Sequence, residues 1–401
     1  MILFLLAQLM VGAQAIGVVT RVSPAVHDRA FTEGYLTQPA VMLDLNPWRD
    51  LLSMKATLNL EGLTIKRGEL TPGIYGEGYV DRRHPHTYLH ELMLVSMTRF
   101  GGERSNAISL AVGKGFAAFG TDDPMARPIE KYPINHHLSQ ILERAVAVGA
   151  LRVSDFVLEA SSFNGDEPTG PGDVPNQNRY WDSWSARVSY TPWTQAELQT
   201  SYARVKSPEN PAGGGADQRK HSASIRLEDN QHSGYALVEW ARTNDYAGSD
   251  QIFAFTSMLA ETWAKYQRVN GAIRIERTER PDEQRLLNEF RSPVPPTDLS
   301  ISGRSRWTIL TARAAVELST NRISYEPFAE VARARVAPTL QPAGFDPRTF
   351  YGSSTIWSLS AGMKIGFGME HMRMGRYGAA ISARPSESMR GMNMPQSHDK
   401  N

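Results

Sequence analysis

Long segments in which apolar and polar residues alternate constrain this chain more than any other feature. Residues 307–318, WTILTARAAVEL, and 356–367, IWSLSAGMKIGF, follow this pattern, as do 183–190 and 268–277. A period of two is typical of β-strands rather than helices. Several segments run for about 10 to 13 residues, near the ~9–11 with which a tilted strand crosses a bilayer and above the ~5–6 of an average strand. The pattern therefore favours membrane-spanning strands.

The links between these segments indicate a closed barrel. Short links such as 192–195 alternate with longer ones rich in Gly, Pro and Asp, such as 164–182 and 280–304. Short periplasmic turns, long extracellular loops and an even number of strands are typical of outer-membrane barrels. We therefore predict an all-β fold, an antiparallel transmembrane β-barrel of about 14 strands (range about 12–16) in the bacterial outer membrane. The expected strands lie near residues 50–60, 87–98, 105–113, 137–148, 154–163, 183–191, 196–206, 219–228, 233–242, 251–263, 267–279, 305–318, 323–335 and 355–367.

Aromatic residues gather near the expected strand ends, where amphipathic rings sit at the level of the lipid headgroups. They are Tyr180, Trp181, Trp184, Tyr190, Trp193, Trp263, Tyr266, Trp307, Tyr351 and Trp357. The general preference of aromatic residues for strands explains part of this set.

Composition excludes several classes of partner and chemistry. Lys and Arg number 43 against 42 Asp and Glu, a formal net charge of +1, so no basic field gathers nucleic acid. The chain has no cysteine, which excludes disulfides, thiolate metal ligands and cysteine nucleophiles. No stretch approaches the ~18 consecutive apolar residues of a membrane-spanning helix.

The two ends of the chain differ from its middle. An apolar run, Ile2–Val11, is followed by Ala13-Gln14-Ala15, a small-x-small pattern typical of signal-peptide cleavage. This predicts four regions. They are a signal peptide at 1–15, an N-terminal periplasmic segment at 16–49, the barrel at 50–367 and a tail containing Met and His at 368–401.

Polar members of the alternating segments are expected to face the lumen of the barrel. The expected lumen-facing residues are Arg187, Arg274, Arg313, Glu317 and Lys364. Residues 114–135 form a link too long for an ordinary turn, and loops of that length are usually functional or disordered. Two hypotheses remain open for this link: a constriction folded into the lumen, and a surface loop with ordinary turn chemistry.

A cluster of histidines precedes the second expected strand. His84, His86 and His90 lie within seven positions, and His136 and His137 come at the same end of the fourth strand. A zinc-protease motif fails, because the position that needs the second histidine is Leu94. Two interpretations remain: a copper or zinc site of imidazoles, or a turn that orders the rim through hydrogen bonds.

The tail offers a second candidate for metal binding. Met372 and Met374 lie beside His371, and thioether with imidazole suits copper(I). The alternative is a disordered polar tail in which the methionines are incidental.

Four stretches carry a family resemblance: DRRHPH, NHHLSQILERA, DSWSARVSYTP and SYARVKSPE. They resemble a family of poorly characterised Gram-negative outer-membrane β-barrel proteins, loosely associated with copper and other metal resistance. The resemblance covers about residues 54–367. It implies no catalytic residues.

We therefore expect a non-enzymatic, porin-like channel for small solutes or ions. Its expected partners are outer-membrane lipid and the barrel-insertion machinery, because the last strand ends on Phe367 and so resembles a barrel-insertion signal. The alternatives are a copper-binding resistance protein and, less favoured, an outer-membrane hydrolase, for which no serine-nucleophile motif is present. No cofactor is required by the channel hypothesis.

Overall fold

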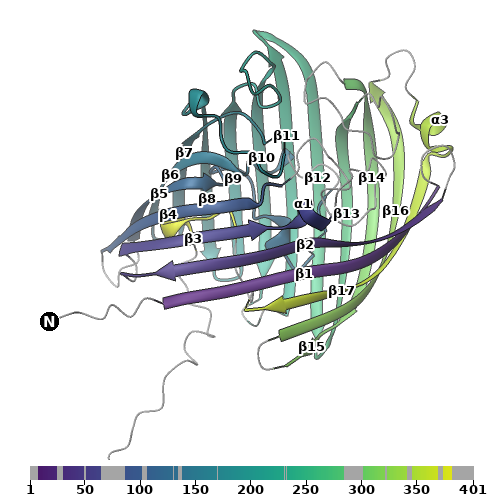
Figure 1. The fold of residues 1–401 in the computed structure, drawn as a ribbon, viewed down its shortest axis with the longest axis horizontal. Coiled ribbons are helices and arrows are strands. Elements are labelled where there is room, and N and C mark those ends of the chain that lie inside the picture. The colour runs from purple at the N-terminus through teal and green to yellow at the C-terminus, as the bar shows by residue number, and fades with distance from the viewer. Residues whose placement is uncertain are drawn as a thin grey trace, which may run out of the picture.

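The fold was analysed in a computed structural model of the chain (Figure 1). The structure describes residues 8–24, 30–48, 51–64, 86–101, 106–129, 131–133, 138–168, 170–229, 231, 233–283, 301–320, 323–340, 346–368 and 374–381.

The described chain is almost entirely antiparallel sheet. Its strands are β1 Gln8–Ser23, β2 Phe31–Asn46, β3 Leu52–Asn59, β4 Leu89–Phe100, β5 Asn106–Gly115, β6 Arg144–Val153, β7 Phe156–Phe163, β8 Ser183–Trp193, β9 Ala196–Val205, β10 Asp217–Glu228, β11 Gly234–Ala247, β12 Asp250–Tyr266, β13 Val269–Glu283, β14 Ile301–Val316, β15 Leu318–Ser319, β16 Ile323–Leu340 and β17 Thr355–Phe367. Short helices lie between them: α1 Glu61–Thr64, η4 Pro124–Ala126, η6 Gln177–Arg179, α3 Pro347–Tyr351 and η8 Gly378–Ala380. None of these helices is long and apolar enough to span a bilayer.

Each strand pairs with its neighbours in sequence, and the last pairs with the first. β1 and β17 run antiparallel in register from Ala13↔Phe367 to Ser23↔Trp357, which closes the sheet. β15 continues β14 for two residues and pairs with the same partner, β16. The barrel therefore has 16 strands. The prediction of a closed antiparallel barrel is confirmed, and the strand count lies at the upper end of the expected range.

The N-terminal boundaries differ from the prediction. Residues 8–23 and 31–46, assigned to the signal peptide and a periplasmic segment, form β1 and β2, so the barrel begins at Gln8 rather than residue 50. The alternation in β1 is hidden because its inward residues Ile16 and Val18 are themselves apolar. They pack against Phe328. A strand with apolar residues on both faces resembles, in sequence, the apolar core of a signal peptide.

Two internal boundaries also shift. The strand expected at 137–148 is β6 at Arg144–Val153, because the preceding residues belong to a loop inside the barrel. The loop expected at 243–250 is a tight hairpin, since β11 reaches Ala247 and β12 starts at Asp250. The remaining links keep the predicted alternation of short and long.

The outer face is apolar along the alternating strands. Leu310 is 51% exposed and Leu359 57%, whereas their neighbours Thr311 and Ser360 are buried on the inner face. Trp184, Trp193 and Trp357 also point outward. Trp307 is the opposite case: it is fully buried inside, donates from Nε1 to Ser305 Oγ at 3.0 Å and meets Tyr351 edge to face. The odd-numbered residues of β14 point inward, so Trp307 faces the interior and not the lipid headgroups, where the sequence analysis expected it.

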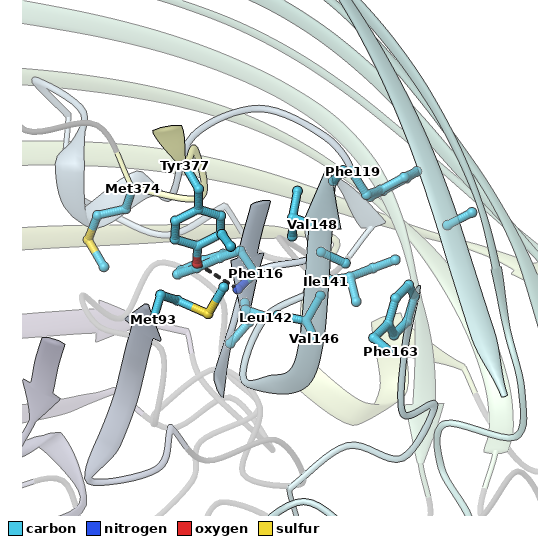
Figure 2. Packing of buried hydrophobic residues seen from close by; sticks show 14 of the residues in the cluster. Met93, Phe116, Phe119, Ile141, Leu142, Val146, Val148, Phe163, Met374 and Tyr377 are labelled. Atoms are coloured by element: carbon cyan, nitrogen blue, oxygen red, sulfur yellow. Dashed lines mark hydrogen bonds between the residues drawn. The ribbon is translucent and has the colours of Figure 1, made fainter. Parts of the chain in front are cut away.

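The inner face is filled on one side of the barrel. The described residues of the link between β5 and β6, 116–129, 131–133 and 138–143, fold into the interior and are called the inward loop. Phe116, Phe119 and Leu142 of this loop pack against inward residues of β4 to β9, such as Met93 and Phe163 (Figure 2). We call this part of the lumen, bounded by β4 to β9, the apolar side.

The chain also returns into the barrel after its last strand. Residues 374–381, the C-terminal segment, lie against β4 to β7, and Tyr377 Oη accepts a hydrogen bond from Phe116 N at 3.0 Å (Figure 2). Arg376 donates to Ser189 Oγ at 2.8 Å and pairs with Glu159. The structure therefore places this part of the predicted Met- and His-containing tail inside the lumen, where its aromatic and guanidinium groups have buried partners.

Candidate functional site

Two of the expected lumen-facing arginines hold the inward loop. Arg187 on β8 forms a bidentate pair with Glu159 at 2.6 and 2.7 Å and donates to Gly120 O at 3.1 Å. Arg274 on β13 pairs with Glu261 at 2.7 Å and donates to Ile129 O at 3.1 Å. Both guanidiniums are fully buried. They therefore fix loop carbonyl groups to the wall instead of lining open space.

The other three expected residues also lie on the inward register. Arg313 on β14 is buried and pairs with Glu326 at 2.5 Å. Glu317 lies at the short-turn end, where it pairs with Lys265 at 2.5 Å and remains about one-third exposed (32%). Lys364 on β17 is half-buried. All five residues thus face inward, but only Glu317 and Lys364 keep substantial exposure.

A band of polar residues, each the cross-strand partner of the next, crosses the wall opposite the apolar side. Arg313 lies beside Glu330, Glu330 beside Ser360, and Ser360 beside Thr20, so the band passes from β14 through β16 and β17 to β1. Thr20 Oγ1 and Ser360 Oγ are 2.8 Å apart. We call the inward faces of β12 to β17 and β1 the polar side.

Several groups on the polar side have no hydrogen-bond partner among the described residues. These are the hydroxyls of Thr278, Thr311 and Ser358 and the second carboxylate oxygen of Glu330. Buried polar atoms of this kind are normally satisfied by ordered water or a bound molecule. The polar side is therefore suited to polar contents, unlike the packed face across from it.

The tip of the inward loop reaches the polar side. Lys131 Nζ lies 2.6 Å from Glu330 Oε1 on β16. Arg127 lies 3.2 Å from Glu239 on β11 and 3.7 Å from Glu261 on β12. Burial opposes ionisation of Arg127, but these two carboxylates raise its pKa above the ordinary value. The loop is thus pinned across the lumen by charge, which bears out the hypothesis of an inward constriction.

Two of the predicted metal-binding histidines come together with a carboxylate that was not predicted. His86, His90 and Glu143 are all buried, and each offers a ligand atom within 4.8 Å of the others. His90 Nδ1 lies 2.6 Å from Glu143 Oε1, and the two imidazole centroids are 4.8 Å apart. The group lies inside the barrel rather than on an exposed rim.

A β-bulge explains how His90 reaches the interior. Thr57 on β3 pairs with Glu91, and Leu58 pairs with Leu89, so His90 is the extra residue on β4. As a result, His90 and Glu91 are both buried although they are adjacent. Bulges redirect side chains in this way and are common beside functional sites.

Glu143 is held by several neighbours at the end of the inward loop. Its backbone has φ of 60°, the left-handed region, and Thr87 N donates to its Oε1 at 2.9 Å. Burial disfavours the carboxylate, but the hydrogen bond and charge of His90, together with His86 and Lys114, hold the pKa of Glu143 below its ordinary value. The carboxylate is therefore the ionised partner of the histidines.

His86 is oriented by a hydrogen bond from Asn59. The Asn59 amide accepts from Glu61 N at 2.9 Å, which orients Nδ2 toward His86 Nδ1, also at 2.9 Å. Nδ1 of His86 is therefore the acceptor, and Nε2 is the atom directed to other groups. Tyr132 of the inward loop meets the same ring edge to face.

Among the described residues, no other predicted metal ligand joins this group. His84, His136, His137 and Met372 lie outside the described residues. Met374 is buried in the apolar cluster of Figure 2 with Met93 and Tyr377. Its thioether therefore contributes to packing. Glu143 and Asn59 were missed because both are far from the histidines in sequence, and neither belongs to a recognisable motif.

The sequence matches no protein-family model and no curated protein. The fold is similar to outer-membrane expressed OmpT of Vibrio cholerae, with a TM-score of 0.51 and 9% identity over 90% of this chain and 98% of that one. The anion-selective porin of Comamonas acidovorans gives a TM-score of 0.48 and 10% identity over 90% of this chain and 100% of that one. At these identities the likeness to OmpT is one of fold. The prediction of a bacterial outer-membrane barrel is confirmed by this fold and its apolar exterior.

Proposed function

We propose that the protein is a narrow, non-enzymatic channel for small polar solutes or ions in the outer membrane. The observation that carries the proposal is the division of the lumen. The inward loop and C-terminal segment fill the apolar side, while the wall opposite carries a registered polar band with unsatisfied hydroxyls. Polar interiors are typical of barrels that conduct.

The geometry favours a narrow path over a wide pore. Lys131 and Glu330 join the loop to the polar side, so a solute passing along that wall meets a pair of opposite charges. Such a pair neither accumulates nor repels one sign of ion strongly. Small polar molecules that hydrogen-bond to the partly exposed Glu317 and Lys364 fit this wall best.

A hydrolase receives less support. Among the described residues no hydroxyl group is hydrogen-bonded to His90, whose recorded partner is Glu143. The hydroxyl of Thr87 donates a hydrogen bond to Leu89 O and accepts one from Lys114 Nζ. A histidine and carboxylate without a nucleophile do not form a triad.

Single-channel recording of the refolded protein tests the proposal. We expect discrete conductance steps from the full chain, and larger steps when residues 374–401 are removed, because the C-terminal segment fills part of the lumen. Absence of steps from both proteins, with folding verified by heat-modified electrophoretic mobility, would exclude a channel.

A further inference from the structure

We propose that His86, His90 and Glu143 form a binding site for one divalent transition-metal ion of the zinc class, inside the barrel where the inward loop joins β6. Two imidazoles and one carboxylate are a common protein ligand set for zinc, which leaves one coordination position open. The inference does not depend on whether the barrel conducts.

The distances are close to those of a loaded site. Zinc–ligand bonds of ~2.0–2.1 Å in a tetrahedron place ligand atoms roughly 3.4 Å apart. His90 Nδ1 and Glu143 Oε1 are 2.6 Å apart, and the three ligand atoms lie within 4.8 Å of one another. The first pair opens by under about 1 Å and the widest closes by roughly 1.4 Å to reach that geometry. Side-chain rotation suffices for both.

The chemistry of the close pair also suits a cation. His90 Nδ1 and Glu143 Oε1 share one proton in their hydrogen bond. A metal ion that enters between the two atoms replaces this proton, and metal binding at histidine sites releases protons in this way. One proton leaves from the His90–Glu143 hydrogen bond, the proton on His86 Nε2 moves to Nδ1, and the three ligand atoms each gain a bond to the dication.

A purely structural role explains the group less well. The β-bulge at His90 and the left-handed backbone of Glu143 are both locally unfavourable. Two such features on separate segments that meet at one point are typical of a functional site.

Asn59 sets the affinity of the site. Its amide donates to His86 Nδ1, whereas metal-binding histidines usually donate from that atom to a carboxylate or carbonyl. Coordination by His86 Nε2 therefore requires the Asn59 amide to turn away. The arrangement favours reversible rather than permanent binding.

Calorimetric titration of Zn²⁺ into the untagged, metal-stripped full chain in detergent tests the inference. We expect one Zn²⁺ per chain. His86→Ala with His90→Ala should abolish this binding, and Glu143→Gln should weaken it at least about tenfold. His221→Ala is the matched control, since His221 is exposed on β10 and contacts Tyr202; it should bind like the unchanged chain.

A second variant tests the role of Asn59. Asn59→Asp supplies an acceptor to His86 Nδ1 and should bind Zn²⁺ about tenfold more tightly. If the variant that lacks both histidines does not fold, the unfolding midpoint of the unchanged chain with and without Zn²⁺ still tests the site. A ligand that binds the folded state must raise that midpoint. Failure of Zn²⁺ to bind the unchanged chain, or stoichiometric binding retained by the folded double variant, would overturn the site. A protein that conducts without binding zinc would contradict the metal site alone, and one that binds zinc without conducting would contradict the channel alone.

Discussion

The two sides of the lumen are built from the same alternating strands but are filled differently. On the apolar side, Phe116 and Phe119 of the inward loop and Tyr377 of the C-terminal segment pack against apolar residues of β4 to β9. On the polar side, Arg313, Glu330 and neighbouring hydroxyls face the interior. The loop touches this wall through polar contacts, made by Lys131, by Arg127 and by the Ile129 carbonyl that Arg274 holds.

The difference shows which side stabilises the molecule and which side remains for function. A packed cluster gains from hydrophobic burial, whereas the charged band gains little net stability, because ion pairs lose hydration when they are buried. The apolar side anchors the C-terminal segment and the two ends of the loop, while charged contacts such as that of Lys131 hold the loop tip. Under the channel proposal, the polar side is the wall along which a solute passes.

Truncating a ring on the apolar side should have the largest effect. Phe163 is fully buried in the cluster, so Phe163→Ala should lower the free energy of unfolding by about 3–5 kcal/mol. Thr311→Ala, on the polar side, removes a hydroxyl without a described partner and should cost under about 0.5 kcal/mol. Reversible urea unfolding in lipid vesicles measures both. Equal costs would show that the polar side is packed as tightly as the apolar side.

Substitutions on the outer face should lower the free energy of unfolding equally on the two sides of the barrel. Leu158 on β7 and Leu310 on β14 are 50% and 51% exposed. Leu158→Arg and Leu310→Arg should each cost about 2–4 kcal/mol if they lie near the midplane of the bilayer, because both place a charge in lipid. The same unfolding assay applies. A small cost at either position would mean that this strand does not face lipid there.

The outer face is the part of the fold that the sequence predicted best. Lipid requires apolar side chains at every second position, and this requirement is visible in segments such as 356–367. The inner face has no such uniform rule. Trp307, Ile16 and Val18 are apolar yet point inside, where they meet Tyr351 and Phe328.

The candidate sites depended on contacts between distant parts of the chain. His86 and His90 were predicted from their spacing, but their partner Glu143 lies 53 positions beyond His90. The C-terminal segment is further still, since Arg376 and Glu159 are 217 positions apart. Periodicity describes neighbours along a strand and carries no information about such pairings.

Detaching the C-terminal segment should change conductance more than stability. Arg376 donates to Glu159, Ser189 and Glu197, so Arg376→Ala removes the charged bonds that hold the segment. The segment should leave the apolar side more often and raise the unit conductance seen in planar bilayers. Arg204→Ala is the control, because Arg204 is exposed and lies 3.9 Å from Asp217. Unchanged conductance would mean that the segment blocks no path.

The smallest expected effect concerns ion selectivity on the polar side. Arg313→Gln removes one positive charge from the inward band, while Glu326 keeps a hydrogen bond from Asn270 at 3.0 Å. The variant should fold normally and shift the reversal potential in a salt gradient toward cations. Glu317→Gln should shift it less and toward anions, because the Lys265–Glu317 pair is partly exposed and such pairs contribute only about 0.2–1 kcal/mol. If Arg313→Gln leaves selectivity unchanged while conductance persists, ions do not pass along the polar side and the path must be sought beside the apolar cluster.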